Sequence, residues 1–225
     1  ARIRRERPGS FVAVCGCMAQ LAPEKLKKAL GVDLVGGNRD HAAFAAEVEK
    51  GLLGRDRAGR GGSFERAGFA ALPAGGLLRR TRALLKIEDG CDNFCSYCII
   101  PYARGRVRSL PFEDALDEAR RLSREGYREI VLTGIEISSY GRDLPGGKGL
   151  LELTKAICEA APCSRVRIGS LKPSVITKEF CEGLSGYENL CRHFHLSVQS
   201  GDDDTLKRMN RRYGAADVRN AVRII

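Results

Sequence analysis

Short apolar runs alternate with segments of helical periodicity in the first fifty residues. Runs of this kind are typical of strands buried on both faces, and their alternation with helices favours a parallel sheet. The first segment is therefore predicted to be an α/β unit. Its expected elements are strands over 11–15 and 32–35, a helix over 23–30 and a helix from Asn38 or Asp40 to about Leu53.

The same alternation returns, more regularly, from about residue 79 onwards. Each predicted strand ends in Gly, Ser or a cysteine motif, and the spacing fits repeated βα units of a parallel barrel. The expected strands are 83–87, 129–132, 166–168 and 193–198, and the expected helices are 112–122, 150–160, 176–184, 205–213 and 217–225.

The segment between these two parts is rich in Gly, Arg and Ala and has no sustained periodicity, which indicates a linker. The expected fold class is α/β, a partial (β/α) barrel preceded by part of a smaller α/β domain. A closed barrel needs more than four strands, so we expect a fragment truncated at both ends. The expected parts are a domain over 1–53, a linker over 54–78 and an incomplete barrel over 79–225.

Composition narrows the class of protein. A hydrophobic content of 43% in 225 residues suffices for a sizeable core. No apolar run approaches the roughly twenty residues that span a bilayer, and the N-terminus lacks an apolar leader, so a cytoplasmic protein without a membrane partner is expected. The net charge of +10 fits either a polyanionic partner or a solvated basic surface.

Nine cysteines without a secretion signal indicate metal or redox chemistry rather than disulfides. Cys91, Cys95 and Cys98 follow a predicted strand in a Cys-x3-Cys-x2-Cys spacing. Three thiolates on one loop can hold three corners of a 4Fe-4S cluster and leave the fourth iron open to an amino acid ligand, such as the methionine part of S-adenosylmethionine. The alternatives are buried thiols or a zinc knuckle, but zinc usually takes four ligands in paired Cys-x2-Cys units, and no second pair lies nearby.

The cysteine loop, with an aromatic residue before its last cysteine, resembles the signature of the radical S-adenosylmethionine (SAM) superfamily. Segments 86–91, 98–105, 199–201 and 206–211 are similar to the methylthiotransferases within it. Segments 132–141 and 195–200 are most similar to the branch that acts on N6-threonylcarbamoyladenosine in tRNA. The isopentenyladenosine branch typically has Pro where Ser197 stands, and the branch acting on a ribosomal-protein aspartate usually departs from the pattern after Cys98.

The resemblance implies a transferase that adds a methylthio group to C2 of the modified adenosine next to the anticodon. It implies two 4Fe-4S clusters and SAM as cofactors. The implied partners are tRNA, a flavodoxin-type or ferredoxin-type electron donor and a sulfur donor. It assigns Cys17, in Gly16-Cys17-x-Ala19-Gln20, to the second cluster, whose other two cysteines would precede Ala1. Cys15 inherits no such role. Open alternatives are the same chemistry on isopentenyladenosine or the aspartate, or a non-catalytic iron–sulfur or RNA-binding protein.

Six residues are candidates for binding the cofactor. The resemblance places Tyr97 by the adenine, Gly134 and Glu136 by the amino group, and Arg211 near the active site. Polar side chains at barrel strand ends face the active site, which adds Ser170 and Gln199. The alternatives are a shielding ring for Tyr97, a turn residue for Gly134, a solvated Glu136 or Arg211, and surface capping for the remaining two.

Other polar residues have weaker predicted roles. The basic stretch Arg104–Arg108 is expected to contact RNA phosphates, with Tyr102 and Tyr140 as candidate stacking platforms, unless it is a solvated loop. His193 and His195 are expected on opposite sides of one strand, with His195 in core or barrel packing. The four cysteines outside the motifs are interpreted as packed or incidental thiols, namely Cys158, Cys163, Cys181 and Cys191.

Overall fold

The chain divides into two units, Ala1–Ala70 with Tyr102–Gly105, and Ala71–Pro101 with Arg106–Ile225. The computed structural model describes residues 2–38, 41–54, 69 and 81–225. Most of the predicted linker over 54–78, and Asp40, therefore lie outside the described residues.

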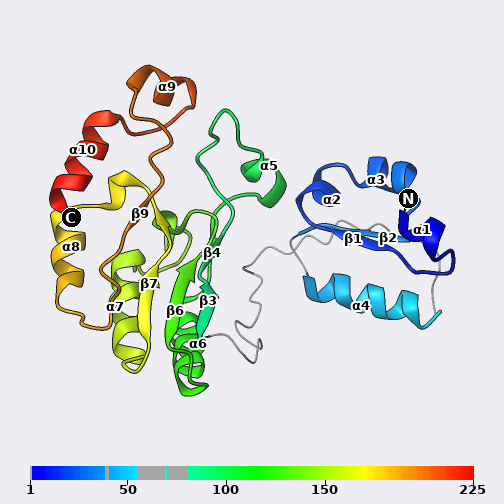
Figure 1. Cartoon of the computed structure of the whole chain (residues 1–225), viewed down its shortest axis with the longest axis horizontal. Coiled ribbons are helices and arrows are strands. Elements are labelled where there is room, and N and C mark those ends of the chain that lie inside the picture. Colours follow the sequence, from blue (N-terminus) through cyan, green and yellow to red (C-terminus); the bar gives the residue numbers. More distant parts are fainter. Residues whose placement is uncertain (1, 39–40, 55–68, 70–80) are drawn as a thin grey trace. The chain divides into compact units, whose positions relative to one another are not determined.

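The first unit is built on two short parallel strands that pair from Ala13 with Leu34 to Cys15 with Gly36. Helices lie on both sides of this pair, α2 and α3 on one side and α4 on the other (Figure 1). A side chain at Gly36 would collide with Phe44 of α4, so glycine allows the helix to pack closely. The elements are α1 (Arg2–Glu6), β1 (Ala13–Cys15), α2 (Cys17–Leu21), α3 (Pro23–Leu30), β2 (Leu34–Gly36) and α4 (His41–Leu52).

The second unit contains a parallel sheet in the order β3-β6-β7, and β8, which follows β7, pairs in parallel with β9. The short strands β4 and β5 form an antiparallel pair beside it. The elements are β3 (Arg82–Lys86), β4 (Glu88–Asp89), β5 (Arg108–Ser109), α6 (Phe112–Arg124), β6 (Glu129–Thr133), a 3-10 turn (Ile137–Ser139), α7 (Leu150–Ala160), β7 (Arg165–Ile168), β8 (Ser170–Leu171), a 3-10 turn (Pro173–Val175), α8 (Lys178–Ser185), β9 (His195–Leu196), α9 (Asp203–Arg208) and α10 (Ala215–Ile224). Helix α5 (Ile100–Arg104) follows the cysteine loop, and its residues from Tyr102 onwards are grouped with the first unit.

Helices cover one face of the parallel sheet. Helix α6 packs on β3 and β6, α7 packs on β7, and α6, α7 and α8 pack on one another in that order (Figure 1). Strand side chains directed at this layer, such as Leu85, Ile130 and Leu132, are at most 2% exposed, whereas Leu84 on the opposite face is 59% exposed. Successive strand side chains point to opposite faces, so one face is core and the other is the open inner face of a partial barrel. The predicted α/β fold class is confirmed.

Several predicted elements are confirmed within a few residues, and the helix over 150–160 matches α7 at both ends. The predicted fourth strand over 193–198 is too long. Only His195–Leu196 pair as β9, because the N–H of Val198 turns back to the carbonyl of Leu196 and Gln199 has a left-handed φ of 68°.

The predicted helices near the C-terminus also need correction. The helix expected over 205–213 starts earlier, because the Asp202 side chain accepts the N–H of Thr205 as an N-cap, and it ends at Arg208 before Asn210, whose φ is 56°. The helix expected from residue 176 begins at Lys178, where the hydroxyl of Thr177 accepts the N–H of Phe180.

Candidate metal and cofactor site

The cysteine loop leaves the sheet at the carboxyl end of β3 and passes through β4 before it reaches Cys91. Gly90, between β4 and the first cysteine, has a φ of 87°, which glycine adopts without strain. Cys91, Cys95 and Cys98 all line one cavity of about 190 Å³. The structure therefore brings the three predicted thiols to the wall of the same cavity, at the strand ends where barrel enzymes place their chemistry.

The segment after α9 holds the cysteine loop in shape. Phe94 has a φ of 48°, a conformation that bulky side chains rarely adopt. Its carbonyl accepts the side-chain N–H of Asn210 at 2.9 Å, and the N–H of Ser96 donates to the carbonyl of Met209 at 3.2 Å. These two contacts link parts of the chain more than a hundred residues apart and support the strained turn.

Five of the six predicted cofactor-binding residues line the cavity with the cysteines. They come from five segments of the second unit and are Tyr97, Glu136, Ser170, Gln199 and Arg211. The sixth, Gly134, is not among the lining residues of this cavity. A Cβ atom at Gly134 would lie 2.7 Å from the carbonyl oxygen of Glu88, so this position requires glycine because the two backbones approach closely.

Glu88 fixes the turn that carries Glu136. Its side chain is completely buried, and Oε2 accepts the backbone N–H groups of Ile135 at 2.9 Å and Glu136 at 2.6 Å. Burial raises the pKa of Glu88 to about 7, with a smaller contribution from the charge of Glu136, while the two N–H donors lower it. Sequence reasoning missed this residue, because nothing in the pattern distinguishes Glu88 from a solvated acid.

A chain of polar contacts runs from Cys91 to the third strand end. The side-chain N–H of Asn93 donates to Cys91 Sγ at 3.0 Å, and Lys172 Nζ donates to Asn93 Oδ1 at 2.9 Å. Lys172 also forms an ion pair with Glu136 at 2.7 Å, and Glu136 accepts the hydroxyl of Ser139. Burial raises the pKa of the Cys91 thiol, and the Asn93 contacts lower it. Glu136 is thus a paired, largely buried carboxylate rather than a solvated one.

Arg211 and Tyr97 form one wall of the cavity. Arg211 Nη2 donates to the Tyr97 hydroxyl at 2.7 Å, and the guanidinium also lies over the Tyr213 ring. Arg211 therefore occupies the cavity that the resemblance implied, whereas a purely solvated arginine was the alternative.

The histidine predictions are wrong. His195 is exposed rather than part of the core, and its Nδ1 lies 3.2 Å from Ser170 Oγ. His193 and His195 line the same cavity instead of facing opposite sides. Only His195 lies in β9, and even within one strand residues two apart would share a face.

In the first unit, Cys17 lies at the carboxyl end of β1, where α2 begins. Asn38 Nδ2 donates to Cys17 Sγ at 3.3 Å, and the Asn38 N–H donates to Gln20 Oε1. Asn38, expected as a helix cap, thus faces Cys17 instead. Cys15 is exposed.

All nine cysteines are unpaired by disulfides. Cys158 and Cys191 are buried as expected, Cys181 is half-buried and Cys163 is exposed. Among the residues that the structure describes, no three His, Cys, Asp or Glu side chains gather closely enough to ligate a single metal ion. The cluster hypothesis therefore rests on the donor set, three thiols around one cavity, which suits iron.

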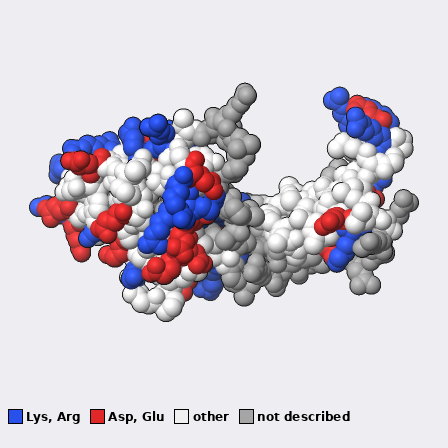
Figure 2. All heavy atoms as spheres, turned by 90° about the horizontal axis from the view of Figure 1, so that it is seen from below, with Lys and Arg blue, Asp and Glu red and all other residues white. Residues whose placement is uncertain are grey.

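The predicted RNA-contacting residues are only partly available. Tyr140 is 2% exposed and donates its hydroxyl to the Leu110 carbonyl, so it is not a stacking platform, whereas Tyr102 is 63% exposed. Arg108 is mostly buried beside Asp89. On the face seen in Figure 2, basic side chains lie next to acidic ones instead of forming one basic patch.

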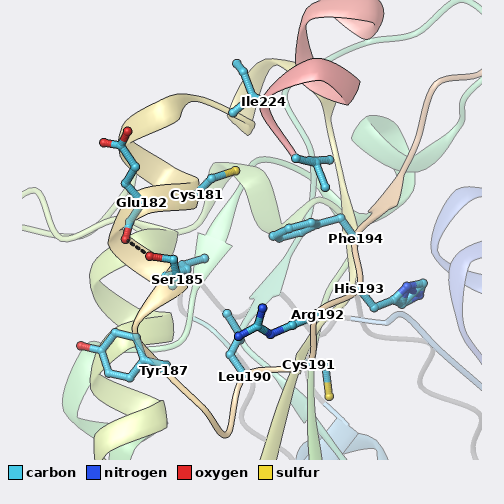
Figure 3. A pocket seen from close by; sticks show the side chains of 12 residues that line it. Cys181, Glu182, Ser185, Tyr187, Leu190, Cys191, Arg192, His193, Phe194 and Ile224 are labelled. Atoms are coloured by element: carbon cyan, nitrogen blue, oxygen red, sulfur yellow. Dashed lines mark hydrogen bonds between the residues drawn. The ribbon is translucent and has the colours of Figure 1, made fainter.

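A larger cavity of about 490 Å³ lies between α8, the segment before β9 and the end of α10 (Figure 3). Phe194 and Ile224 contribute apolar surface, and Glu182 and Arg192 contribute charge. None of the predicted cofactor-binding residues lines this cavity.

Within the described residues, no helix has the length and apolar character needed to cross a bilayer.

Residues 85–225 match the model of the Radical SAM superfamily. The chain belongs to this superfamily. In this radical SAM chain the match begins on β3. It includes the cysteine loop and all the residues that line the cavity around it.

Curated relatives match the chain over most of its length. It is 36% identical to threonylcarbamoyladenosine tRNA methylthiotransferase MtaB of Bacillus subtilis over 94% of the chain and 47% of the relative. It is 37% identical to the MtaB protein of Thermotoga maritima over 98% and 50%, and 34% identical to tRNA-2-methylthio-N(6)-dimethylallyladenosine synthase of Clostridium tetani over 98% and 49%. The radical SAM chain spans about half the length of these relatives.

Solved structures share the fold at low sequence identity. The cobalamin-dependent SAM radical enzyme OxsB matches 99% of this chain and 36% of its own with a TM-score of 0.68 at 16% identity. The radical SAM methyltransferase TsrM of Kitasatospora setae matches 99% and 48% with a TM-score of 0.67 at 18% identity. Both likenesses concern the fold alone.

Proposed function

We propose that the protein is a radical SAM methylthiotransferase that adds a methylthio group to C2 of N6-threonylcarbamoyladenosine next to the anticodon of tRNA. The observation that carries this proposal is the placement of Cys91, Cys95 and Cys98 around one cavity with five predicted cofactor-binding residues. The names of the relatives, at 36% and 37% identity, support the tRNA substrate.

The three thiols of the cavity fit a 4Fe-4S cluster, because they supply three soft sulfur ligands on one loop. When bound, the cluster supplies one electron to the sulfonium of SAM, whose cleavage yields a 5′-deoxyadenosyl radical that activates the C–H bond of the substrate base. The protein contributes binding, orientation and exclusion of water.

The side chains of the cavity divide these tasks. Glu136, held in place by Glu88 and Lys172, offers a carboxylate oxygen to the amino group of the amino acid part. Tyr97, fixed by Arg211, supplies an aromatic surface for the adenine. Ser170, two residues after the end of β7, and Gln199, three residues after the end of β9, supply hydroxyl and amide groups for the ribose or the carboxylate.

The first unit is proposed to hold a second 4Fe-4S cluster through Cys17 and two cysteines from outside this sequence. Its supporting feature is the position of Cys17 at a strand end, within hydrogen-bonding distance of Asn38.

We also propose that the chain divides into the smaller α/β domain over 1–53, a linker over 54–78 and the incomplete barrel over 79–225.

The proposed partners are tRNA, a flavodoxin-type or ferredoxin-type electron donor and a sulfur donor, in the cytoplasm. A second candidate substrate is isopentenyladenosine in tRNA, because the Clostridium tetani relative is named for the dimethylallyl nucleoside at 34% identity. The two identities are close, so the substrate branch has to be decided by experiment.

The test is to express the gene in bacterial strains that lack each modification and to analyse tRNA nucleosides by mass spectrometry. We expect 2-methylthio-N6-threonylcarbamoyladenosine in the corresponding strain and none from a Cys95→Ala variant. Methylthiolation of isopentenyladenosine alone would support the second candidate. Absence of both products from the wild-type gene, with the protein present, would contradict the proposal.

A further inference from the structure

Within the described part of the chain, Cys91 is the only loop cysteine whose sulfur accepts a hydrogen bond from another side chain. The donor is Asn93, at 3.0 Å, and Cys91 is 8% exposed. A hydrogen bond to a sulfur that ligates iron withdraws electron density and so favours the reduced cluster, which is one of the main ways in which proteins set cluster potentials.

The contacts of Asn93 fix the orientation of its amide. Nδ2 faces two acceptors, Cys91 Sγ at 3.0 Å and Glu136 Oε2 at 3.5 Å, while Oδ1 faces the ammonium of Lys172 at 2.9 Å. A flipped amide would turn its oxygen toward the sulfur and the carboxylate and its N–H groups toward the ammonium, losing all three contacts. The amide is therefore held with its donor on the sulfur.

Lys172 strengthens this donor. An ammonium group on the carbonyl oxygen polarises the amide, and hydrogen bonds in such a chain reinforce one another. The Lys172 side chain is only 14% exposed, so water screens its charge weakly. Glu136, 12% exposed, partly offsets that charge but also holds the ammonium next to Asn93.

We propose that Asn93 and Lys172 act as a positioning pair that raises the reduction potential of the cluster on Cys91. The proposal rests on the proposed function, since it requires the cluster. Neither residue ligates iron; Lys172 acts through the amide, and Asn93 acts on the ligand sulfur. The pair makes the one-electron reduction of the cluster easier for a biological donor.

The experiment is an anaerobic redox titration of the reconstituted protein, followed by electron paramagnetic resonance of the reduced cluster. Asn93→Leu removes the donor at similar size, and Lys172→Met removes the ammonium. Lys178→Met, at an exposed lysine of α8, is the matched control for loss of charge. We expect Asn93→Leu to lower the reduced-to-oxidised ratio of the cluster at a fixed potential about tenfold. For a one-electron couple this corresponds to a midpoint potential about 59 mV more negative. Lys172→Met shifts the ratio several-fold in the same direction, and Lys178→Met less than twofold.

A double variant tests whether Lys172 acts through Asn93. If it does, Asn93→Leu with Lys172→Met shifts the midpoint by less than the sum of the single shifts.

A wild-type measurement avoids any folding problem of the variants. With 15N-labelled asparagine side chains, the reduced cluster shows a 15N hyperfine coupling, and deuterium enters at the same site after exchange.

Two results would overturn the proposal and leave the proposed function intact. One is that the cluster-loaded Asn93→Leu and Lys172→Met variants have reduced-to-oxidised ratios within twofold of the wild type. The other is a wild-type cluster that shows no 15N coupling. A wild-type protein that binds no iron–sulfur cluster would overturn the proposed function itself, and with it this inference.

Discussion

Glu88 is a fully buried carboxyl group whose pKa is raised to about 7 from an ordinary value near 4.5, first of all by burial. A carboxyl group with a raised pKa in the folded state contributes stability that is fully present below its unfolded pKa and lost as the pH rises through its folded pKa. The wild-type protein is therefore expected to lose free energy of unfolding between pH 5 and pH 8.

Replacement Glu88→Gln removes this titration and keeps an oxygen acceptor for the N–H groups of Ile135 and Glu136. The free energy of unfolding of the variant, relative to that of the wild type, should rise by about 2–3 kcal/mol between pH 5 and pH 8. Urea titrations at both pH values measure the difference. Glu113→Gln, at an exposed residue of α6, is the control. Parallel pH profiles for wild type and Glu88→Gln would refute the assignment.

Residues with a distinctive spacing were predictable from the sequence, and those defined by contacts were not. The three loop cysteines, Tyr97 and Arg211 belong to recognisable motifs, and all line the cavity. Glu88, Asn93 and Lys172 escaped notice, because an acid, an amide and a lysine gain their roles from partners up to seventy-nine residues away. Burial and pairing of such groups depend on the assembled fold.

Helix α8 depends on its N-cap. The hydroxyl of Thr177 accepts the N–H of Phe180 at 3.1 Å, and Phe180 itself is buried in the core. Thr177→Ala should lower the free energy of unfolding by about 1 kcal/mol, equivalent to about 2–4 °C in the melting temperature. Calorimetry or thermal circular dichroism checks this, with Thr177→Ser, which retains the hydroxyl, as the control. Equal melting temperatures for Ala and Ser variants would contradict a capping role.

At the scale of elements, apolar periodicity found the long helices and the sheet strands but not the short pieces. It located α6, α7 and the β3-β6-β7 sheet, whose buried positions repeat regularly. It missed α1, α2, α5 and the two-residue strands β4 and β5, because such short segments show no period. The end of α9 was also missed, since Asn210 leaves the helix to bind Phe94 of the distant cysteine loop.

At the scale of the molecule, the sequence predicted an α/β chain with a partial barrel, and the family and the fold agree with it. Leu84 is 59% exposed because, among the described residues of the second unit, the helices α6 and α7 pack on the other face of the sheet. The arrangement of charge was less predictable. A net charge of +10 was compatible with a basic patch for a polyanionic partner. On α6, however, Arg120 and Arg121 pair with Asp117 and Glu118 of the same helix.

The central claim is that the three loop thiols hold a cluster with one open iron that cleaves SAM. The most direct measurement is the yield of 5′-deoxyadenosine after anaerobic reconstitution with iron and sulfide and addition of dithionite and SAM. We expect 5′-deoxyadenosine from the wild-type protein, with four irons at this site, and none from Cys95→Ala. A protein with intact thiols that retains zinc, or no metal, and yields no 5′-deoxyadenosine would contradict the account.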